Sequence, residues 1–344
     1  MGKLSKVVAA SVLLFCSLSF GQQKVDPEFV NSDSPLLNTP DPIPVQPPKG
    51  KIPKSILSLG TGRFFSPYAI VADKAKRTLS LWQNQEGQLR LVKIFPVDFG
   101  RKEGDKYQVD DLRTPEGIYF FQKELYGNNL DFSNYGKRAF TMDYPNFFDR
   151  LEKKTGYGIW LHAIPDTKTL KRGSRGCVVV RNEAIDELKS YISLQTTPIV
   201  VKDEVEYITQ QEFQQNSQNL LGFLNQWKQS WQDKNIDSYI SHYHDKFKAL
   251  KMNKKQWKSY KSRLNKQYEK ITVNISNPVI IKHKDEVVVR FLQSYRSDEH
   301  SDFGEKALYI KNVNGQYRII GEEWSALPNT TEYLALVKTE EKGS

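Results

Sequence analysis

Two short apolar segments carry the residues that most restrict how this chain can fold. The first is Trp160–Pro165, which contains His162, and the second is Gly173–Val180, which contains Cys177. Short apolar segments bounded by Gly and Ser are typical of buried β-strands. We therefore predict two neighbouring strands that bring together an imidazole and a thiol lying 15 positions apart in the sequence.

A thiol and an imidazole at one place form a candidate nucleophile and base, because a thiol reacts well only after losing its proton. Gly173 and Gly176 allow a tight turn before Cys177, and we expect the turn to leave the N–H groups of Arg175, Gly176 and Cys177 free to stabilise an oxyanion. The residues alone leave an alternative open, in which Cys177 is a small buried hydrophobe and His162 a core residue.

The first 21 residues have the pattern of a secretory signal peptide. Lys3 and Lys6 precede an apolar stretch over residues 7–20, and we predict cleavage after Gly21. A lipid anchor on Cys16 is not expected, because Phe15 is a poor neighbour for that modification. Cleavage leaves Cys177 as the sole thiol, so no intramolecular disulfide can form and stability must come from packed cores.

The mature chain of 323 residues is long enough for two domains. Its formal charge falls from +10 to +8 when Lys3 and Lys6 are removed. Export argues against nucleic acid as a partner, and the lysines are scattered among carboxylates as on a solvated surface. A locally basic cleft would suit a peptide that ends in a carboxylate.

The region before residue 67 is rich in proline, and the region after it alternates like β-strands. We predict an extended arm over residues 22–66, with a short helix or turn at 56–65. An antiparallel meander is expected next, followed by further strands, two short helices and two long loops. The expected strands are 68–73, 78–83, 89–95, 118–121, 139–144 and 198–201, the helices 146–154 and 182–190 with Asn182 as N-cap, and the loops 99–113 and 122–137.

The composition changes after Lys202 to helices followed by strands, which is an α+β pattern. The expected helices are 211–234, 237–244 and 253–270, and the expected strands 271–275, 279–282, 287–294, 307–312 and 317–324. Asn314-Gly315 predicts a hairpin turn. His242 and His244 lack a third ligand at suitable spacing, so no metal site is expected.

The first domain resembles the YkuD-type L,D-transpeptidase family. The resemblance rests on Thr114-Pro115-Glu116-Gly117, on His162 and on Ser174-Arg175-Gly176-Cys177, and it covers Pro67 to Lys202. Arg175 stands where that family usually has a second His, and Val179 replaces a common Arg. The resemblance implies a β-rich catalytic domain over residues 67–203, a mixed β sandwich with short helices.

The second domain resembles the cone-shaped α+β fold of NTF2-like proteins, particularly in Asn314–Ile320 and Glu322–Trp324. We place it at residues 204–330, followed by a C-terminal tail over 331–344. NTF2-like domains serve as enzymes, pockets or dimerisation modules. This one is expected to bind a cell-wall protein or to form a homodimer.

The pairing of the two domains resembles the cell-shape L,D-carboxypeptidases of helical and curved Gram-negative bacteria. It implies a periplasmic enzyme that trims peptidoglycan stem tetrapeptides through a thioester on Cys177, with His162 as base and the Ala163 carbonyl orienting the imidazole. Arg175 and Gly176 would supply the oxyanion site, and Ser174, Trp160 and Tyr144 would contact substrate. The chemistry needs no metal or organic cofactor. The alternatives are an L,D-transpeptidase and an inactive wall-binding scaffold.

Overall fold

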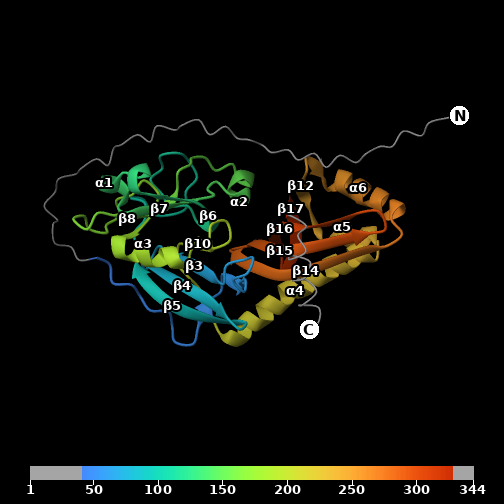
Figure 1. Ribbon diagram of the computed structural model, residues 1–344, viewed down its shortest axis with the longest axis horizontal. Coiled ribbons are helices and arrows are strands. Elements are labelled where there is room, and N and C mark those ends of the chain that lie inside the picture. The colour runs from blue at the N-terminus through green and yellow to red at the C-terminus, as the bar shows by residue number, and fades with distance from the viewer. Residues whose placement is uncertain (1–40, 328–344) are drawn as a thin grey trace. The chain divides into compact units, whose positions relative to one another are not determined.

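The computed structural model describes residues 41–327, which belong to one compact unit built on two large sheets (Figure 1). The predicted signal peptide, the lipid-anchor question at Cys16, the first part of the arm and the tail over 331–344 lie outside the described residues. No helix in the described part of the chain is long and apolar enough to cross a membrane.

The first sheet has eight strands in the order β5-β4-β3-β10-β6-β7-β8-β9. Its first three strands form the predicted antiparallel meander, which is confirmed. Its last two strands, β8 and β9, run parallel to each other at one edge. The bounds are β3 Tyr68–Asp73, β4 Thr78–Gln85, β5 Gln88–Pro96, β6 Gly117–Tyr126, β7 Arg138–Met142, β8 Trp160–Ile164, β9 Val178–Arg181 and β10 Pro198–Lys202.

Short helices cover parts of this first sheet. They are η1 Gly127–Asn129, α1 Phe132–Tyr135, α2 Phe147–Leu151, α3 Asn182–Leu188 and η2 Lys189–Tyr191. The buried side of α3, which includes Ile185 and Leu188, packs on the same core as Leu161 and Val178 of the edge strands. That packing fixes which face of β8 and β9 turns inward.

Two predictions for this domain are wrong in detail. Arg181, not Asn182, is the N-cap of α3, because the Asn182 side chain accepts a hydrogen bond from the N–H of Lys137 and donates to Asp166. The predicted loop over 122–137 is partly regular: β6 continues to Tyr126 by pairing with β7, and α1 follows. The loop predicted over 99–113 contains only isolated bridges.

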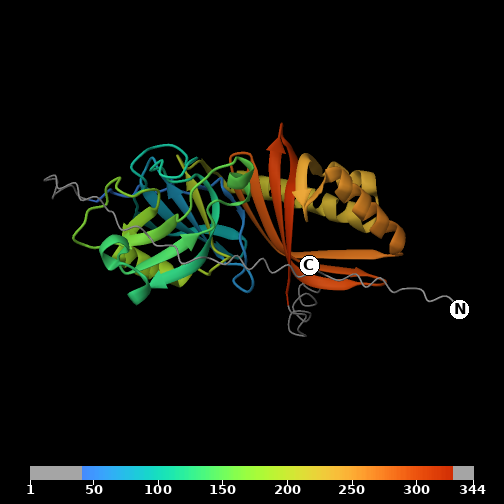
Figure 2. The same ribbon diagram turned by 90° about the horizontal axis from the view of Figure 1, so that it is seen from above.

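The second sheet has the strand order β13-β12-β17-β16-β15-β14-β2, and three helices gather on one of its faces (Figure 2). Trp227, Tyr239 and Trp257 come from these three helices and meet Phe291 of the sheet in one aromatic core. The bounds are α4 Gln210–Gln232, α5 Ile236–Ser241, β12 Tyr243–Ala249, β13 Met252–Asn253, α6 Lys254–Gln267, β14 Ile271–His283, β15 Glu286–Ser297, β16 Ser301–Val313 and β17 Gln316–Ala326.

The order of helices before strands is confirmed in this second domain, with two differences. The helix predicted over 237–244 ends at Ser241, because the chain from Tyr243 pairs with β17 as β12. The strands predicted at 271–275 and 279–282 are one strand, β14, whose register shifts between Ser276 and Val279. Asn314 and Gly315 form the predicted hairpin turn with φ of 53° and 83°.

The end of the arm forms part of a small two-stranded sheet and one edge of the second large sheet. β1, Ile52–Pro53, pairs with β11, Tyr207–Ile208. The prediction of a helix or turn from residue 56 is wrong, because β2, Ile56–Ser58, joins the edge of the second sheet beside β14. Ile56 and Phe65 then pack in a core that contains residues of both domains. The two domains therefore share buried surface.

Candidate active site

The strands predicted around His162 and Cys177 are present as β8 and β9. Leu161 lies opposite Val178 and His162 opposite Val179, with Cys177 directly before β9. Leu161 and Val178 face the core shared with α3. Because side chains alternate along a strand, His162 and Cys177 lie together on the opposite face.

The imidazole of His162 is held by its own neighbour. Its Nδ1 lies 2.6 Å from the carbonyl oxygen of Ala163, and the side chain is buried. In the tautomer in which Nδ1–H donates to that carbonyl, Nε2 has a free lone pair. Burial lowers the pKa of His162 to about 4, with the Ala163 hydrogen bond opposing the shift. The ring is therefore neutral near pH 7 and able to accept a proton.

The thiol of Cys177 is partly exposed and packs beside Ile164 and Val179. Its sulfur donates a weak hydrogen bond to the Gly158 carbonyl at 3.6 Å, and no hydrogen bond joins it to His162 within residues 41–327. Burial raises the pKa of Cys177 to about 11, against the opposing effects of the Trp160 backbone N–H and the Lys106 charge. The resting thiol is therefore protonated and needs a base.

The turn before Cys177 is closed by Ser174. The buried Ser174 hydroxyl donates to the Cys177 carbonyl at 2.8 Å and accepts from the Gly176 N–H at 3.2 Å. Gly176 has φ of 138°, and a Cβ there would lie 2.7 Å from the Arg113 carbonyl oxygen. Glycine is therefore required at this position.

This turn corrects one expectation and adds to another. The N–H of Gly176 is occupied by Ser174 and is not free for an oxyanion, whereas the N–H groups of Arg175 and Cys177 have no acceptor within the described residues. The Ser174 hydroxyl serves the turn and positions Cys177. Its contact with substrate stays a prediction.

The exposed side chain of Arg175 reaches the loop over residues 99–113, where it forms an ion pair with Asp110 at 2.6 Å. The Asp111 carboxylate organises this loop. It accepts hydrogen bonds from the backbone N–H groups of Tyr107 and Arg113 and from the Lys106 ammonium, the last at 2.7 Å. The loop thereby brings the charge of Lys106 near the Cys177 thiol.

The remaining predicted site residues differ in position. Trp160 lies on the face of β8 that carries His162, and its ring packs 5.0 Å from that of Tyr135. Tyr144 is buried and its hydroxyl donates to the Thr155 carbonyl at 3.0 Å. The structure does not bring Tyr144 into contact with His162 or Cys177.

Sequence reasoning missed Tyr135 and Lys106. The Tyr135 ring packs edge-on against His162 at 5.1 Å, and burial followed by the charge of the Cys177 thiolate raises the pKa of Tyr135. Both residues come from segments predicted to be long loops. The length of those loops was the only signal, and it points to no single residue.

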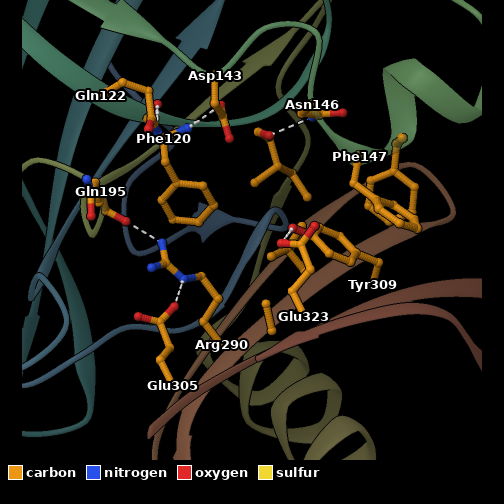
Figure 3. Close-up of a pocket in the computed structure, with 14 residues that line it drawn as sticks. Phe120, Gln122, Asp143, Asn146, Phe147, Gln195, Arg290, Glu305, Tyr309 and Glu323 are labelled. Atoms are coloured by element: carbon orange, nitrogen blue, oxygen red, sulfur yellow. Dashed lines mark hydrogen bonds and ion pairs between the residues drawn. The ribbon is translucent and has the colours of Figure 1, made fainter. Parts of the chain in front are cut away.

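Other features do not extend this site. No three His, Cys, Asp or Glu side chains between residues 41 and 327 gather as a metal would require. A pocket of about 230 Å³ lies between β6, α2 and the second sheet, and it contains neither His162 nor Cys177. Figure 3 shows Arg290 in this pocket between Glu305 and Gln195. Burial raises the pKa of Asp143, on its wall, to about 7.

Comparisons with known proteins follow this division of the chain. Residues 67–201 match the model of the YkuD L,D-transpeptidase catalytic domain, and residues 219–323 match that of the Cds6 C-terminal NTF2-like domain. None of the curated proteins compared with the chain gives a significant sequence match.

Two solved structures resemble both domains together. Bd1075 from Bdellovibrio bacteriovorus is 43% identical, with a TM-score of 0.76 over 81% of this chain and 100% of that one. The helical cell shape determining protein Pgp2 from Campylobacter jejuni is 25% identical, with a TM-score of 0.64 over 78% of this chain and 96% of that one. The resemblances and the fold class predicted from the sequence are confirmed. This chain belongs to the family of L,D-transpeptidase-type proteins that join a YkuD catalytic domain to a Cds6-type NTF2-like domain.

Proposed function

We propose that the protein is a periplasmic L,D-carboxypeptidase that trims peptidoglycan stem tetrapeptides to tripeptides. The observation that carries this proposal is the arrangement at the sheet edge, where Cys177 and His162 share one face and the Ala163 carbonyl holds the imidazole Nδ1 at 2.6 Å. The match to the catalytic domain supports a peptidoglycan substrate.

In the first step, His162 Nε2 takes the proton of the Cys177 thiol while the sulfur attacks the amide carbonyl that precedes the terminal D-residue. Near pH 7 the imidazole and the thiol are both neutral before the reaction, since the pKa of His162 is about 4 and that of Cys177 about 11. Proton transfer is therefore expected to accompany the attack rather than to precede it. The N–H groups of Arg175 and Cys177 are the candidates to stabilise the oxyanion.

The tetrahedral intermediate then collapses to a thioester. The carbon–nitrogen bond breaks, the departing amine receives the proton held by His162, and the D-amino acid leaves. In the second step His162 activates water, which attacks the thioester and releases the tripeptide and the thiol. Transfer of the acyl group to the amine of a second stem would instead form a cross-link.

That second outcome, L,D-transpeptidation, is the alternative function, and the description of the matched catalytic-domain model favours it. Carboxypeptidase is preferred because the two domains together resemble cell-shape L,D-carboxypeptidases, and because the similar Pgp2 is a cell shape determining protein. Trimmed stems cannot act as donors in later cross-linking, so the proposed activity would alter cell curvature. The inactive scaffold remains the third possibility, motivated by Arg175 in place of the usual His.

The test is mass spectrometry of muropeptides incubated with the mature protein, with Cys177→Ala and with His162→Ala. We expect tetrapeptide to become tripeptide with the wild type alone, and each variant to lose activity by about 10³-fold or more. Dimers joined through two diamino acids would establish the transpeptidase. If the wild type leaves the muropeptides unchanged, the result would favour the inactive wall-binding scaffold.

A further inference from the structure

The turn between β14 and β15 in the NTF2-like domain makes an ion pair with the catalytic domain. Lys284, in this turn, places its Nζ 3.1 Å from Oε2 of Glu116. Glu116 belongs to the Thr114–Gly117 turn and is only 6% exposed. Its other oxygen, Oε1, accepts from the buried Lys74 at 3.0 Å. Each oxygen of this buried carboxylate thus has one ammonium partner, and the partner of Oε2 comes from the other domain.

Glu116 is also linked to the middle of the loop over residues 99–113. Its backbone N–H donates to Oδ1 of Asp105 at 2.8 Å, and the Lys74 ammonium that binds its side chain donates to the Gly104 carbonyl at 2.6 Å. Asp105 uses its second oxygen to accept from Lys154 at 2.7 Å. The Glu116 turn is therefore joined to the loop directly at Asp105 and, through the Lys74 ammonium, at Gly104.

The same loop continues into the catalytic centre. Lys106 follows Asp105 directly, and its charge lowers the pKa of Cys177 against the larger effect of burial. Asp110, four residues on, holds Arg175 in the turn before Cys177 at 2.6 Å. A displacement of residues 104–111 would change both the charge near the thiol and the placement of that turn.

We infer that Lys284 is a positioning residue for the reaction at Cys177. By holding Oε2 of Glu116, the NTF2-like domain keeps the loop of residues 104–111 in the arrangement in which the Lys106 charge acts on Cys177 and Asp110 pairs with Arg175. The second domain thus contributes to the chemistry of the first. This inference rests on the proposed function. The side chain of Lys284 is 60% exposed, so the residue can be replaced without opening a core.

The decisive variant is Lys284→Glu in the full mature chain. The substitution removes the ammonium partner of Glu116, and the new carboxylate repels the Glu116 carboxylate. We therefore expect kcat on muropeptides to fall by about tenfold while KM changes by less than about twofold. Amide hydrogen exchange over residues 104–111 should become faster, because the loop loses an anchor. The rate of Cys177 alkylation by iodoacetamide rises with pH as the thiol ionises. The pH at which this rate reaches half of its maximum should increase in the variant, because Lys106 moves away from the sulfur.

Two further variants complete the experiment. Lys284→Met removes the positive charge without adding a repelling one. Its kcat should fall by about two- to fivefold, and its loop exchange and thiol titration should change in the same direction as in Lys284→Glu. Lys255→Glu is the matched control, because Lys255 is an exposed lysine of α6 in the same domain and makes no ion pair with any described residue. It makes the same change in net charge and should behave as the wild type.

The exchange and alkylation readouts do not depend on turnover, so they separate this inference from the proposed function. If the wild type leaves muropeptides unchanged, the proposed function fails, while the loop and thiol measurements still report whether Lys284 holds residues 104–111. If Lys284→Glu and Lys255→Glu show the same loop exchange and the same thiol titration, Lys284 is not a positioning residue and the inference is overturned, whatever happens to kcat.

Discussion

Both domains bury lysines, and two of them, Lys154 and Lys261, one from each domain, have opposite environments. Lys154, in the catalytic domain, contacts Asp105 at 2.7 Å and Asp149 at 3.0 Å. Lys261, on α6 of the NTF2-like domain, forms no ion pair within residues 41–327 and lies 4.0 Å from the centre of the Trp231 ring and 4.9 Å from that of Trp257. Carboxylates surround the first ammonium, and aromatic rings surround the second.

This difference sets the charge of each lysine. Burial alone would lower the pKa of Lys154, but the hydrogen bonds and charges of Asp105 and Asp149 outweigh burial and raise it above its ordinary range. Burial lowers the pKa of Lys261 to about 7, since Glu322 attracts the ammonium too weakly to compensate. The catalytic domain therefore keeps a permanent buried cation as part of its framework, while the NTF2-like domain holds one that gains or loses its proton near neutral pH.

The largest effect in this comparison is expected from Lys154→Met. It leaves the buried carboxylate of Asp149 and the partly buried carboxylate of Asp105 without their cation, which should lower the free energy of unfolding by about 3–5 kcal/mol. Chemical denaturation at pH 7 measures this. The double variant Lys154→Met, Asp149→Asn should recover part of the loss, because one of the uncompensated charges is removed. A single variant as stable as the wild type would show that the cation is not part of the framework.

A pH-dependent effect is expected from Lys261→Met. The folded state binds the proton of Lys261 with a pKa of about 7, against about 10.4 in the unfolded chain. Between these values the unfolded state holds more protons, so this group makes stability rise with pH, by up to about 1.4 kcal/mol per pH unit. Below pH 7 Lys261 is protonated in both the folded and the unfolded state, so its contribution to the free energy of unfolding no longer changes with pH. The full destabilisation caused by burying its charge is present there.

The measurement is the free energy of unfolding of the wild type and Lys261→Met from pH 6 to pH 10. The difference between the two proteins isolates this residue, because all other groups titrate in both. We expect the variant to be the more stable at pH 6 and the advantage to shrink steadily above pH 7. Parallel curves would mean that the aromatic surroundings do not disfavour the ammonium.

The sequence predicted the parts of the fold that repeat a clear pattern. Strands β3 to β5 alternate over several residues with turn residues between them, and α4 spaces its apolar residues at helical intervals. β2 was missed because its partner, β14, lies more than 200 residues away, and three residues of a proline-rich arm have no local strand signal. β12 was missed because it follows α5 almost directly.

The site divides in the same way. His162 and Cys177 could be predicted as site residues because their side chains carry the chemistry and because the two lie in, or directly before, short apolar strands. The role of the Ser174 hydroxyl in holding the Gly176 N–H depends on the direction of one bond in a tight turn, which the sequence does not specify. The position of Lys106 depends on how a long loop of the catalytic domain folds, and the Glu116–Lys284 pair depends on how two domains meet, so only the three-dimensional structure reveals them.

The smallest effect should come from Lys258→Ala, which tests whether distance or burial governs the comparison. Lys258 lies 2.6 Å from Asp237, closer than Lys154 lies to Asp149, but the two side chains are 44% and 82% exposed. Water screens such a pair and both side chains lose rotamer freedom to form it, so its removal should cost at most about 1 kcal/mol. Chemical denaturation at low and high salt measures this. A loss comparable to that of Lys154→Met would mean that contact distance, rather than the removal of both partners from water, determines what a lysine contributes to this fold.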